Sequence, residues 1–264
     1  MKVWITGASS GIGHALAIEF AKRYAEQSTV IGLVGRRLSE LQALQTMLNT
    51  EFQVRSEVYV LDVRDSAAMK NAAQAFMQQF GDPNIVIASA GVSCGTLTEF
   101  AEDIPAFQAV MDINVMGMVH TFQPFIAGMK QLARAKQAAH LVGIASVAGV
   151  RGLPGAGAYS ASKAATISYL ESLRVEMARD QIVVTTIAPG YIKTPMTDVN
   201  DYAMPFLMAV DKAAIKFVDA ILAKRRFVII PWQMAIVAKI MHVIPPYIWD
   251  KIAQNAPHKK RIGG

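Results

Sequence analysis

Short, continuous apolar runs alternate with helical patterns along most of this chain, and that alternation restricts the fold more than any other feature. The apolar runs predict strands at 2–6, 29–34, 55–61, 84–88, 139–145, 182–188 and 227–230. Helical patterns fill the intervals, notably at 14–26, 38–50, 66–80, 104–135 and 158–179. Strands that are apolar throughout are buried on both faces, as in parallel sheets. We therefore predict an α/β fold, a doubly wound parallel sheet of about seven strands with helices on both faces.

The 264 residues fit one domain, 1–264, because α/β folds of this length often form a single unit. A single cysteine, Cys94, excludes an intrachain disulfide and fits a reducing compartment, so we expect a cytoplasmic protein. We interpret Cys94 as a small loop residue, with a catalytic thiol as the alternative. The chain enters its first strand at once, which predicts no signal peptide. The histidines lack metal-ligand spacing, and we expect no metal site.

A glycine-rich segment, Thr6-Gly7-Ala8-Ser9-Ser10-Gly11-Ile12-Gly13, joins the first strand to the first helical pattern. Glycines in such a turn allow the backbone to approach a pyrophosphate, and the helix N-terminus then binds the anion. Glycine triplets alone also occur in ordinary tight turns. Here strand, turn and helix stand in the order that a dinucleotide site requires.

Tyr159 and Lys163 lie four residues apart in a helical pattern, so they share one helix face. A phenol has a pKa of about 10, and a nearby ammonium lowers it. Such a pair can act as a general acid and base near neutral pH. Taken alone, the spacing also fits a half-buried tyrosine beside a solvated lysine. Ser146 ends the strand expected at 139–145, which places its hydroxyl at the carboxyl edge of the sheet, where ligands bind.

These motifs together resemble the short-chain dehydrogenase/reductase family. The matching pieces are Thr6-Gly-x-x-x-Gly11-Ile-Gly13, Asp62-Val63, Ala90-Gly91, Asn114, Ser146, Tyr159-x-x-x-Lys163 and Pro189-Gly190 with Thr194. They follow the order of the family up to about residue 195, and the likeness fades after about 200. The resemblance implies a Rossmann-type fold that binds a nicotinamide dinucleotide.

The resemblance also implies roles for individual residues. Ser146 would hydrogen-bond the substrate oxygen, Tyr159 would exchange its proton, and Lys163 would lower the Tyr159 pKa and hold the nicotinamide ribose. The catalytic set is Asn114, Ser146, Tyr159 and Lys163. The cofactor-binding set is Gly7, Ser9, Ser10, Gly11, Ile12, Gly13, Arg36, Arg37, Asp62, Val63, Ala90, Gly91, Tyr159, Lys163, Pro189, Gly190, Ile192 and Thr194.

The end of the second strand indicates which dinucleotide binds. In NAD-binding folds of this type, an acidic residue there accepts hydrogen bonds from the adenosine ribose 2′-OH. Here Gly35 takes that place, and Arg36 and Arg37 follow. A guanidinium suits bidentate binding of a 2′-phosphate, and the resemblance adds Ser9 to that site. We therefore predict a preference for NADP(H) over NAD(H). The alternative is a solvated arginine pair at the start of the next helix.

Three positions leave their interpretation open. Family members carry two asparagines before Ala90-Gly91, whereas this chain has Ala88 and Ser89, a change that affects local stability more than chemistry. The resemblance implies that Asn114 holds a local helix distortion and a water linked to the lysine, although a surface asparagine is the alternative. Asp62 is expected to contact the adenine, to cap the helix beginning near Ser66, or to do both.

The substrate pocket is expected between Val92–Glu99, Val147–Gly155 and a variable lid at 195–210. Met196, Met204, Phe206, Leu207 and Met208 in the lid suit a hydrophobic carbonyl compound. Ordinary packing of a lid helix explains the same residues equally well.

The C-terminal segment 224–264 carries the whole basic excess, because it has eight Lys or Arg residues and one acid, Asp250. Residues 1–223 carry 18 basic and 19 acidic side chains, which gives −1. The run 227–238 is uncharged but is too short to span a membrane, and Pro245-Pro246 breaks the helical pattern beyond it. Peripheral contact of 227–261 with an anionic membrane, an oligomer interface and a cover over the substrate pocket are the alternatives. Without a recognition motif, we expect no nucleic-acid partner.

We predict an NADP(H)-dependent oxidoreductase that interconverts a carbonyl and an alcohol on a small, hydrophobic substrate and forms a homo-oligomer. The alternative is a peripheral scaffold or sensor that binds NADP(H) without turnover. The presence of Ser146, Tyr159 and Lys163 favours the enzyme.

Overall fold

The computed structural model describes residues 1–25, 27–255, 259 and 261, and a seven-stranded parallel sheet forms its centre. The strand order is β3-β2-β1-β4-β5-β6-β9. The strands are β1 Lys2–Thr6, β2 Val30–Gly35, β3 Arg55–Val60, β4 Ile85–Ala88, β5 His140–Ile144, β6 Val183–Pro189 and β9 Phe227–Ile230. The predicted α/β fold is confirmed, and each strand lies within one residue of its expected bounds. The strand order reverses between β1 and β4, where folds of this kind bind ligands.

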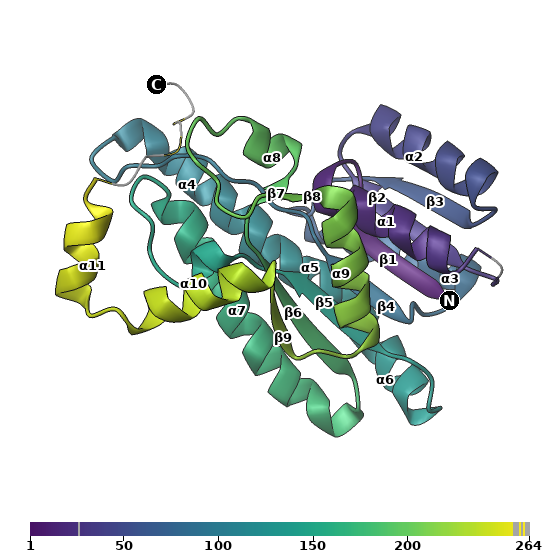
Figure 1. The fold of residues 1–264 in the computed structure, drawn as a ribbon. Helices are drawn as coiled ribbons and strands as arrows, with labels where there is room; N and C mark the ends of the chain where they lie inside the picture. The colour runs from purple at the N-terminus through teal and green to yellow at the C-terminus, as the bar shows by residue number, and fades with distance from the viewer. Residues whose placement is uncertain (26, 256–258, 260, 262–264) are drawn as a thin grey trace.

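Helices cover both faces of the sheet (Figure 1). They are α1 Gly11–Arg23, α2 Leu38–Glu51, α3 Ser66–Phe80, α4 Ile104–Met111, α5 Gly117–Phe122, α6 Ile126–Arg134, α7 Gly157–Met177, α8 Pro195–Asp198, α9 Val210–Leu222, α10 Trp232–Val243 and α11 Pro246–Ala253. One face packs against α1, α2 and α9, and the other against α3, α5, α6 and α7. The helix expected at 14–26 starts earlier, at Gly11, and residue 26 lies outside the described residues.

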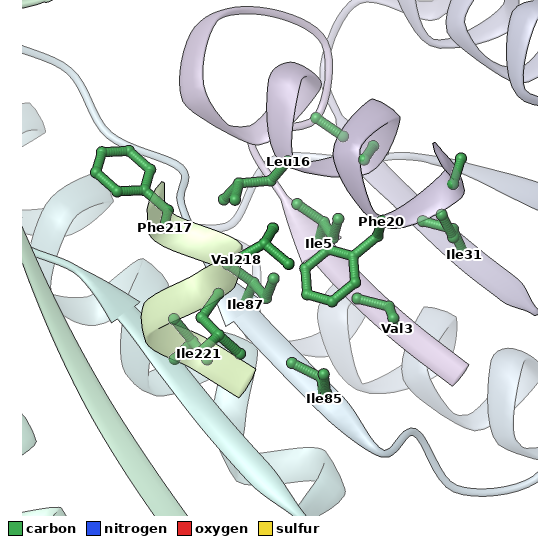
Figure 2. Close-up of a cluster of buried hydrophobic side chains, with 14 of the residues drawn as sticks. Val3, Ile5, Leu16, Phe20, Ile31, Ile85, Ile87, Phe217, Val218 and Ile221 are labelled. Atoms are coloured by element: carbon green, nitrogen blue, oxygen red, sulfur yellow. The ribbon is translucent and has the colours of Figure 1, made fainter. Parts of the chain in front are cut away.

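Successive side chains of β1 enter opposite cores, because strand side chains alternate between the two faces of a sheet. Val3 and Ile5 are fully buried in the cluster that α1 and α9 complete, shown in Figure 2. Trp4 is fully buried in the other core. The centre of its ring lies 5.3 Å from the centre of the Phe76 ring and 5.2 Å from that of Phe125. Burial of such side chains stabilises each by about 1.5–3 kcal/mol relative to exposure, so β1 holds the two halves of the domain together.

The single helix predicted over 104–135 is divided in the structure. A π-helical turn at Asp112–Met116 separates α4 from α5, and a 3₁₀ turn at Gln123–Phe125 separates α5 from α6. Pro124 cannot donate a backbone hydrogen bond and therefore interrupts the helix ladder. The π-helical turn contains Asn114, whose side chain bonds outside the helix.

Two short strands and a helix follow the carboxyl end of β6. β7 Ile192–Lys193 pairs in parallel with β8 Met208–Ala209, and α8 lies between them. A capping box of Thr194 and Thr197 fixes the start of α8. The segment expected to act as a lid, 195–210, is therefore tied to the domain at both ends.

The C-terminal helices α10 and α11 extend from the edge of the sheet beyond β9 (Figure 1). Ile244 and Pro245 separate them, and Pro246 is the first residue of α11, so the helical pattern breaks at the two prolines as the sequence indicated. Along the described chain, none of the helices is both long and apolar enough to cross a bilayer. Of the tail considered in the sequence, residues 256–258, Lys260 and residues 262–264 lie outside the described residues.

The environment of His140, at the start of β5, lets us predict how the free energy of unfolding depends on pH. Its ring nitrogen Nε2 lies 2.8 Å from the Thr185 hydroxyl, which donates its own proton to the Arg225 carbonyl at 2.6 Å. Burial lowers the pKa of His140 to about 4. Because the unfolded chain binds this proton near pH 6.5 and the folded chain does not, stability should fall by about 3 kcal/mol between pH 6.5 and 4.

A His140→Gln variant tests this pH dependence, because glutamine keeps an N–H donor but does not titrate. Its free energy of unfolding, measured by urea denaturation, should depend less steeply on pH in that window than the parent's. Equal slopes for parent and variant would contradict the assignment of a neutral His140.

Candidate active site

A cleft of about 390 Å³ opens along the carboxyl ends of the parallel strands. Every residue expected to bind the cofactor lines it, from the glycine turn after β1 to Thr194 before α8. Of the expected catalytic residues, Ser146, Tyr159 and Lys163 also line it, whereas Asn114 does not. Among the described residues, no three His, Cys, Asp or Glu side chains gather in a way that would hold a metal ion.

Two glycines in the turn after β1 are required by space. A Cβ atom on Gly13 would lie 2.4 Å from the carbonyl oxygen of Gly7, and one on Gly7 would lie 2.8 Å from the backbone of Ala90. Gly7 also has a φ of +73°, which L side chains rarely adopt. These contacts bring the first turn of α1 into the wall of the cleft. The N–H groups and positive dipole end of that turn suit a phosphate, so the cradle fits a dinucleotide.

The far end of the cleft is lined by two arginines. The Arg37 guanidinium donates to the Ser9 carbonyl oxygen at 2.9 Å and to its hydroxyl at 3.4 Å. The Arg36 side chain is 60% exposed and lies 3.7 Å from the Asp62 carboxylate. Arg37 therefore braces the glycine turn, whereas Arg36 is available to an incoming anion.

Asp62 contacts Arg64 and does not cap α3. It accepts from the Arg64 backbone at 3.0 Å and from the guanidinium at 2.8 Å, which lowers the Asp62 pKa. The cap of α3 is Asp65, whose side chain accepts from the Ala68 N–H at 2.9 Å. The capping interpretation of Asp62 was therefore wrong, because Asp65 stands directly before the first helical residue.

Ser146, Tyr159 and Lys163 meet at the opposite end of the cleft from the arginines. Ser146 follows β5, and its oxygen accepts from the Ala148 N–H at 3.1 Å, which leaves its own proton to be donated to another oxygen. Ser146 is close enough to the Tyr159 oxygen that donation from its hydroxyl acts to lower the Tyr159 pKa. Lys163 is buried one turn further along α7 and donates to the Ile144 carbonyl at 2.9 Å.

Burial determines the protonation of both titratable groups. It raises the pKa of Tyr159 above 10, and the hydrogen bond to Ser146 opposes this rise only in part. The Lys163 ammonium lies 5.8 Å from the centre of the Tyr159 ring, and burial lowers the Lys163 pKa to about 8. The Lys163 ammonium is directed to a backbone carbonyl, and the expected lowering of the Tyr159 pKa by this lysine stays a prediction.

Asn114 is buried behind the cleft and holds the loop that follows β4. Its oxygen accepts from the Val92 N–H at 2.8 Å, and its amide donates to the Val92 carbonyl at 3.0 Å and to the Ser162 hydroxyl at 2.9 Å. The alternative of a surface asparagine was wrong. The same side chain lies in the π-helical turn, as the resemblance implied.

Thr6 braces the loop at the positions where this chain has Ala88 and Ser89. Its hydroxyl accepts from the Ser89 N–H at 3.3 Å and donates to the Ile87 carbonyl at 3.4 Å. A buried threonine on β1 thus supports the backbone around these two positions.

Two residues near the end of the chain contact the loop beside the catalytic residues, and sequence reasoning missed both. Arg261 donates to the Asp103 carboxylate at 2.8 Å, and its guanidinium lies 3.6 Å from the centre of the Phe100 ring. Lys259 donates to the Ser93 hydroxyl at 2.9 Å. Asp103 is buried and also accepts from the Leu97 N–H at 2.8 Å, so Arg261 holds the expected wall of the substrate pocket. In the sequence, the only indication of these contacts was the excess of positive charge in residues 224–264.

A third missed residue, Arg151, joins the loop after β5 to the C-terminal helices. Its guanidinium donates to the carbonyls of Met241 and Ile244 at 3.1 and 2.9 Å, at the end of α10. It also lies 5.2 Å from the centre of the Trp249 ring on α11. The C-terminal helices are therefore attached to a loop that starts at Ser146.

Residues 1–203 match the family model described as short chain dehydrogenase. The chain belongs to the short-chain dehydrogenase/reductase family. An uncharacterized oxidoreductase from Myxococcus xanthus is 35% identical over 251 residues, which is 95% of each chain. Another from Mycobacterium tuberculosis is 31% identical and covers 96% of this chain and 97% of its own. The resemblance inferred from the motifs is thus confirmed.

Solved structures share the fold of this short-chain dehydrogenase. A family member from Burkholderia phymatum in complex with NAD covers 99% of this chain and 97% of its own, with a TM-score of 0.80 and 22% identity. L-Sorbose reductase from Gluconobacter frateurii, complexed with NADPH and L-sorbose, covers 86% of this chain and 94% of its own. Its TM-score is 0.74 and its identity 26%. NAD and NADPH complexes therefore both occur on this fold.

Proposed function

We propose that this short-chain dehydrogenase/reductase transfers hydride between NADP(H) and a carbonyl or alcohol substrate. One observation carries the proposal: Ser146, Tyr159 and Lys163 meet at one end of a cleft whose other end has the features of a phosphate site. When bound, the dinucleotide supplies or accepts the hydride, and the chain supplies placement and a proton.

Three side chains of the protein have separate roles in the proposed reaction. Because its raised pKa keeps Tyr159 protonated at neutral pH, the phenol holds a proton for the substrate oxygen in the reductive direction. The Ser146 hydroxyl, whose oxygen already accepts from Ala148, donates to the same oxygen as charge develops there. The buried Lys163 ammonium places a positive charge beside the phenol ring and would hold the nicotinamide ribose of a bound cofactor.

Arg36 supports the proposed preference for NADP(H). It lines the cleft with its guanidinium largely exposed, next to the position where a 2′-phosphate would be held. Hydrogen bonds to charged groups contribute about 1.5–3 kcal/mol. We therefore expect Arg36→Ala to raise the KM for NADPH by about 10–100-fold and to leave the KM for NADH nearly unchanged.

Arg64→Ala is the matched control for Arg36. Arg64 binds the same Asp62 carboxylate, but it does not line the cleft. Its loss should change neither KM. Equal effects of Arg36→Ala on NADPH and NADH, or a parent enzyme that binds both equally well, would exclude the phosphate role of Arg36.

The substrate proposed is a hydrophobic carbonyl compound or the matching alcohol. Met196 lines the cleft, and Phe206 and Leu207 in the proposed lid expose about half of their apolar surface. Flexible thioethers and aromatic rings adapt to bulky apolar ligands.

A panel of ketones, aldehydes and alcohols, monitored by NADPH absorbance, tests the proposed function. Turnover of at least one apolar carbonyl supports it. Tight NADPH binding without turnover across the panel would favour the alternative, a scaffold or sensor.

We also propose that the enzyme forms a homo-oligomer, since Ile104, Phe107 and Met116 expose large apolar surfaces around α4. A cytoplasmic location stays a prediction.

A further inference from the structure

Helix α10 is apolar on both its buried and its exposed faces. Met234 and Ala238 pack inward, and Met234 lies against Gly190 beside the cofactor cleft. On the outside, four side chains spaced by four, four and three residues form one stripe, which we call the outer stripe. Its members and their exposed fractions are Trp232 (67%), Ile236 (52%), Ile240 (53%) and Val243 (69%).

Helix α11 follows α10 after the Pro245–Pro246 corner (Figure 1) and also exposes apolar side chains. Tyr247 and Ile252 are exposed by 67% and 59%. Arg151 fixes the corner from inside, through the α10 carbonyls and the Trp249 ring. The apolar surface is therefore held in place before any partner arrives, which lowers the ordering cost of binding.

Cations lie on both helices of this surface, and three more precede β9, at the end of that strand away from α10. Residues 224–255, all of which the structure describes, contain five exposed cations and one acid, Asp250. Lys239 borders the outer stripe on α10, Lys251 lies on α11, and three cations precede β9. The three are Lys224, Arg225 and Arg226.

We propose that α10 and α11 dock this protein on the surface of an anionic lipid bilayer, with the outer stripe in the acyl boundary and the cations at the headgroups. Apolar helix faces with Trp or Tyr and flanking cations bind at such interfaces. A second copy of the chain is a poorer occupant, because it would bring a second basic segment to this surface with one acid, Asp250, in each copy up to residue 255. An anionic surface instead neutralises them.

Docking would place the reaction site close to the lipid. α10 starts directly after β9, and its inner face covers Gly190 at the edge of the cleft. The Arg151 contacts join the docked helices to the loop after Ser146. A hydrophobic substrate dissolved in the bilayer would thus lie near the proposed active site.

Co-sedimentation of the full-length protein with vesicles tests this proposal, and it is independent of turnover. We expect binding to phosphatidylcholine vesicles that contain phosphatidylserine, weakened by salt, and little binding to phosphatidylcholine alone. The fluorescence of Trp232 should shift to shorter wavelength on binding. The double variant Ile236→Glu, Ile240→Glu should reduce binding at least 10-fold without unfolding, because both side chains face solvent.

Val175→Glu is the matched control, since Val175 is 65% exposed on α7, away from the outer stripe. It should bind vesicles as the parent does. The proposal is overturned if the parent ignores anionic vesicles at low salt, or if Val175→Glu and the double variant lose binding equally. Sedimentation velocity completes the test: a dimer that the double variant dissociates, in a protein that ignores vesicles, would assign the surface to a second copy.

Discussion

Tyr159→Phe should reduce turnover by about 10²–10⁴-fold, because it removes the hydroxyl that is the proposed proton donor and leaves the rest of the side chain in place. Phenylalanine keeps the ring, which packs beside Lys163 in the wall of the cleft. The fold and the affinity for NADPH should therefore persist. Steady-state kinetics with a substrate of the parent, thermal unfolding and NADPH fluorescence titration measure the three quantities.

Tyr169→Phe provides the control on the same helix. Tyr169 is half-buried against the core on α7 and lies outside the cleft. The same deletion of a hydroxyl there should leave kcat unchanged. If Tyr159→Phe turned over its substrate as fast as Tyr169→Phe does, the phenol would have no acid–base role.

Lys163→Met should also abolish most turnover, and it should do so without weakening the fold. Burial holds the Lys163 pKa at about 8, against an ordinary value of 10.5. Keeping this ammonium charged at pH 7 therefore costs about 3 kcal/mol of folding stability. Methionine removes that cost but leaves the Ile144 carbonyl without its partner, a penalty of about 1–3 kcal/mol.

The two terms offset, so we expect the unfolding free energy at pH 7 to stay within about 1–2 kcal/mol of the parent's. The alkaline range separates the proteins. Between pH 8 and 10.5 the unfolded parent binds this proton and the folded parent does not, so the parent gains stability with rising pH, relative to the variant. Urea denaturation at both ends of the range measures the difference.

Lys70→Met, at an exposed position on α3, is the control for loss of one lysine. It should change neither turnover nor the pH dependence. A Lys163→Met variant with parental kcat/KM would remove Lys163 from the proposed machinery. A variant that unfolds at pH 7 would show that the bond to Ile144 outweighs the cost of the buried charge.

The sheet was predictable because its signal is local. Each parallel strand is a short apolar run buried on both faces, and residues such as Val3, Trp4 and Ile5 show this in the sequence. The site was predictable because its residues follow strand ends or share one turn of helix, as Ser146, Tyr159 and Lys163 do. Helix α9 was missed although Phe217, Val218 and Ile221 have helical spacing, because it lies between the apolar lid and the basic tail, whose signals dominate that part of the sequence.

The remaining features depend on partners that sequence spacing does not reveal. Lys163 binds a backbone carbonyl, which has no residue signature, so the direction of its ammonium was not foreseen. Asn114 interrupts the helix through two bonds to Val92, in a loop 22 residues away. Arg261 pairs with Asp103 across 158 residues, a separation at which neither helical nor strand periodicity carries information.

That pair has a consequence for the order in which the molecule is completed. A domain generally folds as a unit, but its N-terminal part leaves the ribosome first. The glycine turn, Ser146 and Tyr159 have all emerged once β6 ends at Pro189, whereas the arginine that holds the 93–103 loop arrives more than 70 residues later. The residues that line the cofactor cleft therefore all leave the ribosome well before the arginine that holds the proposed wall of the substrate pocket.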